Sequence, residues 1–286
     1  MLVVSRSRFV GYTLVYAAFA LLCFVTLAHD DGLGFGRKPW ENLKRTGAEM
    51  AHPSFLDVWF GAQHLEYKSD AGQVLRVENR REVEAKFLRG LASAVWTTLR
   101  IATLGTLLAG LLALPLSFLT ARNLAAPKML ALPAKFVLDA CRAIHTLVFG
   151  LLLVGIVGLG PTAGILAIAI HSMGSFGKLY AEAIESLDMA AIDAVRAVGA
   201  RPLQVFFLSV WPAVLPQFIS IHFYIWEYNI RDSTVLGLIG AGGLGLLVSE
   251  AISLFQWSRL ATILIVIIAM VMAFDSLSRV VRNRLL

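Results

Sequence analysis

The sequence predicts an all-α membrane protein with about six transmembrane helices. Hydrophobic residues make up 58% of the 286 residues, charged residues make up 15%, and the mean hydropathy is +0.73. In ordinary soluble domains, charged residues account for roughly a quarter of the chain. The hydrophobic residues also gather into long runs with few or no charges, and about 20 such residues let a helix cross a bilayer. Both observations indicate membrane-spanning helices.

The apolar runs divide into six expected spans. The run from 143 to 177 is too long for one helix, and "GLGP" at 158–161 divides it, because Gly160 ends one helix and Pro161 begins the next. The expected spans are 9–28, 92–119, 141–158, 162–180, 207–228 and 257–278. The stretch 233–249 is rich in glycine, and we expect it to form a short, broken element at membrane depth before the last helix.

The distribution of Lys and Arg orients these spans. With the N-terminus in the cytoplasm, the cytoplasmic segments are 1–8, 120–142, 178–201 and 279–286, and together they carry 12 Lys and Arg residues. Segment 29–90 carries equal numbers of basic and acidic residues and is long enough to cross the membrane regardless of charge. Both termini are therefore expected in the cytoplasm. Because the basic residues flank separate spans and form no single stripe, the sequence indicates no nucleic-acid partner.

Three regions are expected along the chain. They are an N-terminal transmembrane helix at 1–28, an outer loop at 29–90 and a membrane core at 91–286. The outer loop mixes aromatic and charged residues, which is typical of amphipathic segments lying at a membrane interface. A cleaved secretory signal is an alternative for the first region, although its apolar run exceeds the usual 7 to 15 residues.

One short helix is expected between the fourth and fifth spans. Asp188 is placed as its N-cap, Gly199 ends it and Pro202 prevents continuation. Asp193 and Arg196 are spaced to form an ion pair on the polar side. The apolar stripe is expected at Ala191, Ala194, Val195 and Val198. A second set of small residues, Ala190, Ala191, Ala194 and Ala197, would let another protein approach closely. The alternative is a solvated helix without a partner.

The segment that contains this helix, "DAVRAVGARPLQVFFLSVWP", resembles the cytoplasmic loop of type I ABC importer permeases. The pattern of that loop is E-A-A, three residues, Gly, nine residues and I-x-L-P. Asp193, Ala194 and Val195 occupy the E-A-A positions, Gly199 is the glycine and Pro212 the final proline. Asp193 keeps the negative charge, whereas Val195 departs from the pattern. The resemblance marks 182–216 as the coupling loop and implies the permease fold of this superfamily.

A narrower resemblance connects residues 88–286 with the permease subunit of phosphonate importers. It rests on "RAIHTLVFGLLLVGIVGLGPTAGILAIAIHSMGSFGKLYAEAIE" and on "HFYIWEYNIRDSTVLGLIGAGGLG". In that branch an aromatic residue, an acidic residue and an x-N-x-R step precede V-L-G and V-G-A-G-G-I-G runs. The matching positions here are Trp226, Glu227, Asn229, Arg231, 235–237 and 239–245.

The resemblance implies a division of labour within a bacterial inner-membrane complex. Two permease copies would form the pathway in the lipid bilayer, two copies of a separate ATPase would dock on the coupling loops, and a periplasmic solute-binding protein would deliver a phosphonate-like substrate. ATP and Mg would bind to the ATPase, and this chain would need no cofactor and catalyse no reaction. In agreement, the sequence lacks the G-x-x-x-x-G-K-[ST] phosphate-binding loop. Cys23 and Cys141 have no ligand partners at metal-site spacing.

Polar residues near the spans are candidates for the pathway or its gate. Charges in hydrocarbon are costly, so Arg100, Glu227, Asn229 and Arg231 are expected to face protein or a water-filled cavity. The functional interpretation is that Arg100 or Arg231 meets the phosphonate, since guanidinium matches phosphate-like oxygens. In the structural interpretation, Arg100 extends to the interface while Glu227 and Arg231 form an i, i+4 ion pair. The sequence leaves both open.

The glycine run raises a second question of interpretation. Gly240, Gly242 and Gly245 have the G-x-G-x-x-G spacing of a dinucleotide-binding turn, but this run follows an apolar span and no acidic residue occurs where the motif needs one. We therefore expect Gly240, Gly242, Gly243 and Gly245 to shape a broken helix that acts as a gate.

Other function classes remain as alternatives. A related importer could carry phosphite, a phosphate ester or an amino acid. An ion-coupled secondary transporter would often show an internal repeat with two broken helices, and one broken element is present here. An intramembrane enzyme would need a catalytic pair at depth, which the "HSMGS" run at 171–175 does not supply.

Overall fold

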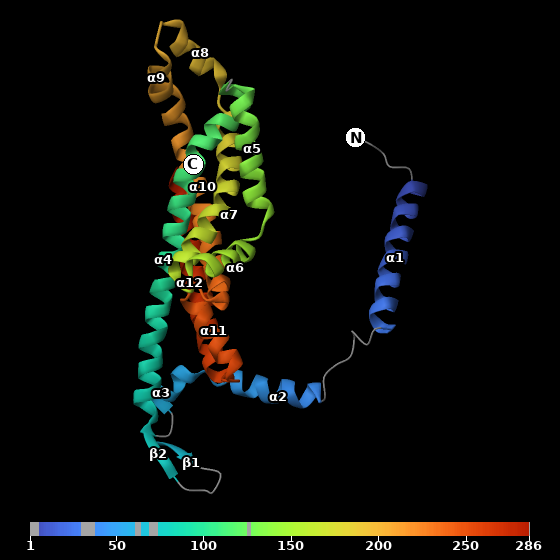
Figure 1. Ribbon diagram of the computed structural model, residues 1–286, viewed down its shortest axis with the longest axis vertical. Coiled ribbons are helices and arrows are strands. Elements are labelled where there is room, and N and C mark those ends of the chain that lie inside the picture. The colour runs from blue at the N-terminus through green and yellow to red at the C-terminus, as the bar shows by residue number, and fades with distance from the viewer. Residues whose placement is uncertain (1–5, 30–37, 61–63, 69–73, 125–126, 286) are drawn as a thin grey trace. The chain divides into compact units, whose positions relative to one another are not determined.

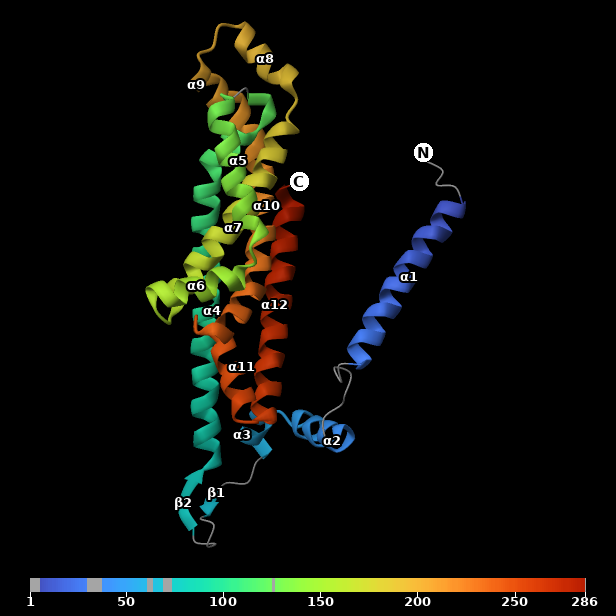
Figure 2. The ribbon, with the colours of Figure 1, turned by 45° about the vertical axis from the view of Figure 1, so that its right-hand side comes forward.

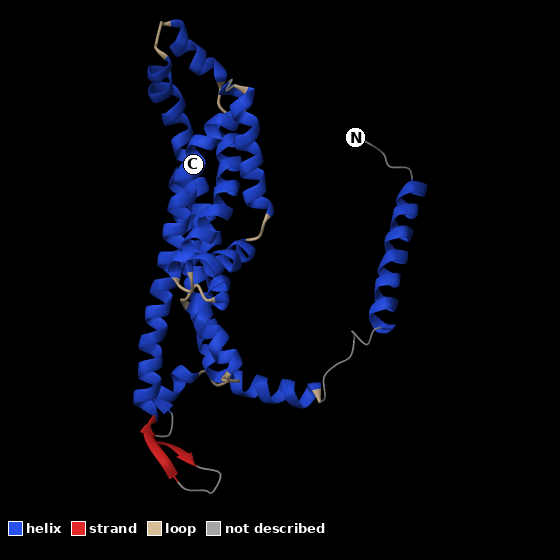
Figure 3. Cartoon of the chain, viewed as in Figure 1, coloured by secondary structure: helices blue, strands red, loops and turns tan. Residues whose placement is uncertain are grey.

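The computed structural model describes residues 6–29, 38–60, 64–68, 74–124 and 127–285, and these are nearly all helical (Figures 1 and 3). The chain divides into two compact units, Met1–Ala48 and Glu49–Leu286. The first contains α1 (Arg6–His29) and most of α2 (Pro39–Met50). Helix α1 covers the expected span 9–28, and its segment Gly11–His29 is long and apolar enough to cross a membrane.

The second unit is a helical bundle preceded by a small hairpin. Its elements are η1 (Ser54–Leu56), α3 (Asp57–Phe60), β1 (His64–Lys68), β2 (Val74–Asn79), α4 (Arg80–Thr120), η2 (Arg122–Leu124), α5 (Lys128–Ala143), α6 (Thr146–Val157), α7 (Pro161–Glu185), α8 (Met189–Ala197), α9 (Pro202–Val205), η3 (Phe206–Val210), α10 (Trp211–Leu236), η4 (Gly237–Ile239), α11 (Leu244–Ser253) and α12 (Trp257–Leu285). Figure 2 shows α12 lying beside α10 and α11 along one side of the bundle.

Four helical segments in the described residues are long and apolar enough to cross a membrane. They are Gly11–His29, Arg80–Thr120, Pro202–Ile239 and Trp257–Arg284, and the bent pair α5 and α6 would make a fifth. Helix α7 is also long, but it lies in the middle of the bundle, packed by α4, α5, α6 and α10. Its buried positions are mostly small residues, which bring neighbouring helices close.

The expected span 141–158 is wrong as a single helix. Ile144 and His145 have extended backbone conformations, and His145 Nδ1 accepts a hydrogen bond from Leu147 N, 3.2 Å away, which caps α6. The axes of α5 and α6 therefore differ by 93°. Sequence reading missed this break because no Gly or Pro marks it between residues 134 and 149.

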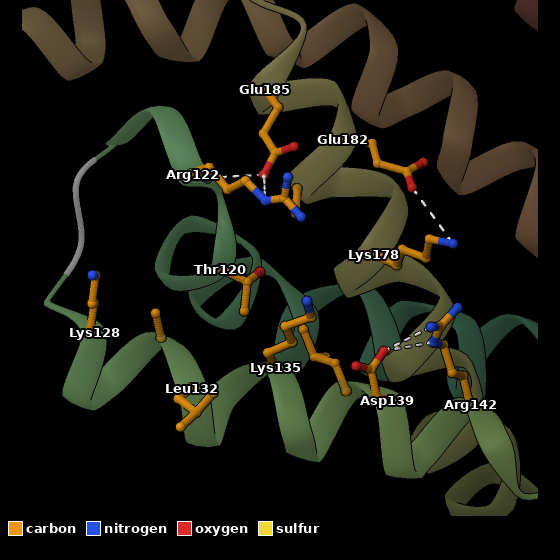
Figure 4. A pocket seen from close by; sticks show the side chains of 13 residues that line it. Thr120, Arg122, Lys128, Leu132, Lys135, Asp139, Arg142, Lys178, Glu182 and Glu185 are labelled. Carbon is orange, nitrogen blue, oxygen red and sulfur yellow. Dashed lines mark hydrogen bonds and ion pairs between the residues drawn. The ribbon is translucent and has the colours of Figure 1, made fainter.

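Segment 120–142, expected as a cytoplasmic loop, is largely helix α5. Its buried residue Leu138 lies against Gly174 and Gly177 of α7, where an added Cβ would collide with Leu138. Together with Leu138, the charged residues of this segment, which made it resemble a loop, line a cavity on the side of α5 that faces α7 (Figure 4). Hydropathy alone does not recognise such a half-polar helix.

Besides the short helices α2 and α3, the region before the bundle contains two strands that the sequence did not predict. Strands β1 and β2 pair antiparallel, and Asn79 then caps α4 by accepting a hydrogen bond from Arg81 N, 3.1 Å away. Helix α4 thus begins at Arg80, well before the apolar span 92–119. A buried ion pair between Glu84 and Arg259, 3.0 Å apart, joins its first turns to α12.

Three apolar clusters hold the bundle together, and α4 takes part in each of them. The first is centred on Phe176, Tyr180 and Phe218, and the second on Ile230 and Ile263. The third is centred on Ile101, Ile168 and Leu236. Where α4 crosses α7, a Cβ on Gly105 would come within 2.8 Å of Ile168 Cβ, so glycine permits the close approach.

Candidate functional site

The short helix expected between the fourth and fifth spans is present as α8. Asp188 caps it by accepting a hydrogen bond from Ala190 N at 3.0 Å, and Asp193 pairs with Arg196 at 3.0 Å. Gly199 has a φ of +83°, the left-handed conformation that ends the helix at low cost. The predicted start, end and ion pair are therefore confirmed. Figure 1 shows α8 and α9 together at one end of the bundle.

The predicted apolar stripe of α8 is wrong except at Val195, which is half-buried and packs against the cluster around Ile192. Ile192 is the buried residue, 2% exposed, and it packs with Val205 and Val210. Ala191 and Ala194 are exposed, and Val198 is 83% exposed. Burying Ile192 removes more apolar area from water than burying an alanine, which explains the rotation of the helix about its axis. The small residues Ala190, Ala191, Ala194 and Ala197 are all left on the exposed side.

The segment after α8 enters the bundle through a distorted turn. Residues Phe206–Val210 form a π-helical turn, in which Trp211 N donates to Phe206 O. Pro212 follows at the start of α10 and has no N–H to give to the preceding turn. Of the residues predicted for ATPase coupling, Pro212 therefore lies in the first turn of α10. The others lie on or beside α8: Asp188, Asp193, Ala194, Arg196 and Gly199.

Asn229 lies at the centre of a buried polar network. It is 0% exposed; its Nδ2 donates to Thr106 Oγ1 of α4 at 2.8 Å, and its Oδ1 accepts from Ser172 Oγ of α7 at 2.9 Å. Nearby, Trp226 Nε1 donates to Thr103 Oγ1 at 3.0 Å. The predicted pathway residue Asn229 thus ties three helices together.

One contact of the structural interpretation, the ion pair of Glu227 with Arg231, is present. Glu227 is buried and forms an ion pair with Arg231, and it lies 3.8 Å from Arg282 Nη2. Arg100 is exposed on α4 and donates to Thr97 Oγ1 at 3.2 Å. Neither Arg100 nor Arg231 lines the two cavities described below.

The glycine run forms a tight turn between α10 and α11. Gly240, Gly242 and Gly243 have φ of +99°, +87° and +71°, so any other residue would be strained there. Gly245 has an ordinary φ, but it lies against the backbone of Thr234 and Gly237 and has no room for a Cβ. The predicted short, broken element is confirmed in its geometry.

Two contacts hold this turn against the rest of the bundle. Gly160 N, in the turn between α6 and α7, donates to Gly240 O at 3.0 Å. Leu244 N donates to Thr98 Oγ1 of α4 at 2.9 Å, which caps α11. The two glycine turns of the sequence therefore meet in space.

A charged cavity, which sequence reading missed, opens between α5 and α7. This α5–α7 cavity has a volume of about 630 Å³ (Figure 4). Its charged residues are Arg122, Lys128, Lys135, Asp139, Arg142, Lys178, Glu182 and Glu185. Lys128, Lys135 and Arg142 recur every seven residues, which places them on one face of a helix. That spacing was the available signal.

A second cavity of about 430 Å³ lies between α7 and α10. We call it the α7–α10 cavity; its lining residues are Arg142, His171, Ser172, Ser175, Lys178, Leu179, Tyr224, Ile225 and Tyr228. It shares Arg142 and Lys178 with the α5–α7 cavity. In the described part of the chain, no group of three His, Cys, Asp or Glu residues is arranged to hold a metal ion.

Comparison with known families identifies the bundle. The pattern of the family described as "Binding-protein-dependent transport system inner membrane component" matches residues 113–286, which run from the last turns of α4 to the end of α12. The chain belongs to this family. Its α8 and the glycine turn both lie within the matched segment.

Curated relatives narrow the similarity. Over 186 residues the chain is 42% identical to the phosphite transport system permease protein PtxC of Stutzerimonas stutzeri. This match covers 65% of this chain and 68% of PtxC. It is 37% identical over 189 residues to the phosphate-import permease protein PhnE of Mycolicibacterium smegmatis. That match covers 66% of this chain and 36% of PhnE.

Solved structures share the fold. An amino acid ABC transporter matches with a TM-score of 0.59 and 18% identity, over 71% of this chain and 97% of that one. The inward-facing MetNI methionine ABC transporter matches with a TM-score of 0.56 and 22% identity, over 67% of this chain and 95% of that chain. The expected type I ABC importer permease fold is confirmed, and the chain is a membrane-spanning transport subunit.

Proposed function

We propose that this permease forms the membrane pathway of an ATP-driven, binding-protein-dependent importer of phosphonates, phosphite or a related phosphorus oxyanion. The observation that carries the substrate class is the 42% identity to a phosphite permease over 186 residues, 65% of the chain. Two copies in the bacterial inner membrane would enclose the pathway and alternate access to its two sides. Both termini would lie in the cytoplasm, as the distribution of Lys and Arg predicts.

In this proposal, α8 is the docking element for a separate ATPase. It lies at one end of the bundle, presents small exposed residues that allow close approach, and is anchored by the buried Ile192. Because α8 has a capped start and a defined end, it can transmit movement of the ATPase to α7 and α10 as a rigid body. ATP and Mg²⁺ would bind to that ATPase, and a periplasmic solute-binding protein would supply the substrate.

The decisive experiment is transport by a reconstituted complex. The permease would be co-expressed with an ATPase and a solute-binding protein, for which the neighbouring reading frames are the first place to search, placed in liposomes, and supplied with phosphite or methylphosphonate. We expect uptake that needs the binding protein and ATP and is blocked by vanadate. Uptake driven by an ion gradient without ATP, or transport of amino acids but of neither anion, would contradict the proposal.

A further inference from the structure

The α7–α10 cavity differs from the α5–α7 cavity in its charges. Its lining has two cationic side chains, Arg142 and Lys178, and no carboxylate, whereas Asp139, Glu182 and Glu185 all line the α5–α7 cavity. The remaining polar groups are an imidazole and the hydroxyls of two serines and two tyrosines. Every one of these groups can donate a hydrogen bond in a suitable protonation state or tautomer, as an oxyanion requires.

Most of these donors are not used within the chain. The hydroxyls of Ser175, Tyr224 and Tyr228 make no hydrogen bond to the described residues, whereas Ser172 Oγ is held by Asn229. His171 Nδ1 donates to Ile144 O at 2.8 Å, because a carbonyl can only accept, so the N–H of the neutral ring is already used and Nε2 is an acceptor. The cavity thus offers several groups that need a partner.

The two cations are held loosely. Arg142 pairs with Asp139 at 2.8 Å, and Lys178 with Glu182 at 3.7 Å, and all four side chains are exposed by more than a third. Exposed pairs of this kind contribute about 0.2–1 kcal/mol, so a bound anion can replace the carboxylates. Guanidinium also presents two parallel N–H groups to an oxyanion, which a lysine cannot do.

The cavity is placed where a solute could cross. His171 and Ser172 lie near the middle of α7, and Ser172 connects directly to the Asn229 network. Arg142 and Lys178 also line the α5–α7 cavity, whose other residues continue along α7 to its last residue, Glu185 (Figure 4). An anion held in the α7–α10 cavity would therefore meet basic side chains along the way to the α5–α7 cavity.

We propose that the α7–α10 cavity is a transit site for the phosphorus oxyanion. Arg142 and Lys178 supply the positive charge, and the hydroxyls of Ser175, Tyr224 and Tyr228 supply neutral donors. This inference rests on the proposed function. The volume of the α7–α10 cavity, about 430 Å³, falls within the range of small-ligand sites. Neutral hydroxyls around exposed cations give the weak binding that release requires.

The test compares three variants in the reconstituted complex, with phosphite as the probe. Arg142→Gln removes the shared guanidinium, and Tyr228→Phe removes one hydroxyl while keeping the ring. Arg279→Gln is the matched control, because Arg279 forms a similar exposed ion pair with Asp275 on α12 and lines neither cavity. Phosphite uptake and ATP hydrolysis are measured on the same samples.

We expect Arg142→Gln to lower phosphite uptake about tenfold or more, and Tyr228→Phe to lower it about threefold to tenfold. ATP hydrolysis stimulated by the binding protein should stay close to that of the unmodified complex, so fewer anions move per ATP. Arg279→Gln should transport normally. Because Arg142 pairs only with an exposed carboxylate on its own helix, its removal leaves no buried charge unpaired.

Three outcomes would count against the transit site. Uptake by Arg142→Gln equal to that of the unmodified complex would overturn it. So would an equal loss in Arg279→Gln. If Arg142→Gln prevents two copies from associating while Tyr228→Phe transports normally, the cavity is a subunit interface. Failure of the unmodified complex to transport phosphite or methylphosphonate would instead overturn the proposed function.

Discussion

Asn229 illustrates how a single polar residue can define the packing of a membrane bundle. Its amide is fully buried and joins α10 to α4 and α7 through Thr106 and Ser172. Such interhelical hydrogen bonds contribute about 0.6–2 kcal/mol in membranes, so their main effect is to select one arrangement of the helices. Because Ser172 also lines the α7–α10 cavity, the arrangement that Asn229 selects is the one in which that cavity exists.

Among Gly240, Gly242 and Gly243, the glycines with positive φ in the turn between α10 and α11, Gly243 is expected to be the most sensitive to substitution. Its φ is +71°, and an added Cβ would collide with Thr98 Oγ1, which caps α11. Gly243→Val should therefore abolish uptake and shorten the life of the permease in detergent. Gly242→Val, at a φ of +87° but with open space, should cost only the backbone strain of about 1–2 kcal/mol.

The control for this pair is Gly155→Val in α6, where a side chain would meet nothing within 4 Å. Uptake and thermal stability would be measured for all three variants, together with nucleotide binding by the ATPase, which should not change. Equal stability and uptake of Gly243→Val and Gly155→Val would show that the glycine turn has no part in the mechanism.

Among the elements, α8 combines a fixed orientation with an exposed surface. Ile192, Val205 and Val210 hold it against the bundle, and the left-handed Gly199 lets the chain turn back into α9. The residues matched to the coupling-loop pattern, Asp193 and Ala194, are exposed. Packing therefore uses one side of α8 and leaves the other available for a partner.

Two substitutions test coupling through α8. Gly199→Val forces a β-branched residue into a left-handed conformation and should disturb the end of the helix, while Asp193→Lys places two positive charges one turn apart on the docking side. Both should lower transport-coupled ATPase activity while the permease still inserts into the membrane. Activity would be measured in purified, assembled complexes.

Gly199→Asn serves as the matched control, because asparagine tolerates the left-handed conformation and the surrounding space is open. It should retain coupling. Normal coupling in both Gly199→Val and Asp193→Lys would refute the assignment of α8 as the docking helix, and loss of coupling in all three variants would argue against a role for the backbone turn.

At the scale of the whole molecule, the bundle has two chemically different parts. Helix α12 and the apolar side of α4 suit lipid, whereas α5 and the central α7 carry charges that line the α5–α7 cavity. A half-polar helix inside a membrane protein is stable when its charges face other protein or water. This arrangement leaves the charged side of α5 for the pathway or for a second copy of the chain.

The orientation of the chain is also testable as a whole. The distribution of Lys and Arg predicts that the C-terminus lies in the cytoplasm. A tag fused after residue 286 should therefore resist protease added to intact spheroplasts and be cleaved after detergent is added. A tag inserted after Gly72, in the expected periplasmic region, should be cleaved without detergent. The reverse pattern would invert the predicted topology.

The sequence by itself determined the local features whose cause is local. Composition indicates a membrane protein, the Asp188 cap and Gly199 define α8, and the G-L-G-P turn and the glycine run mark where helices must end, because backbone conformation depends on the residue in place. The coupling-loop pattern also led to the correct family.

Only the tertiary structure decided which side of each helix packs against its neighbours. It rotated α8 toward Ile192, broke the expected span at His145, and turned an expected loop into α5 by seating Leu138 against the glycines of α7. It likewise placed Arg282 of α12 beside Glu227 of α10 and brought Arg142 and Lys178 together at two cavities. These outcomes depend on packing between residues far apart in the chain, and one sequence does not reveal which distant surfaces meet.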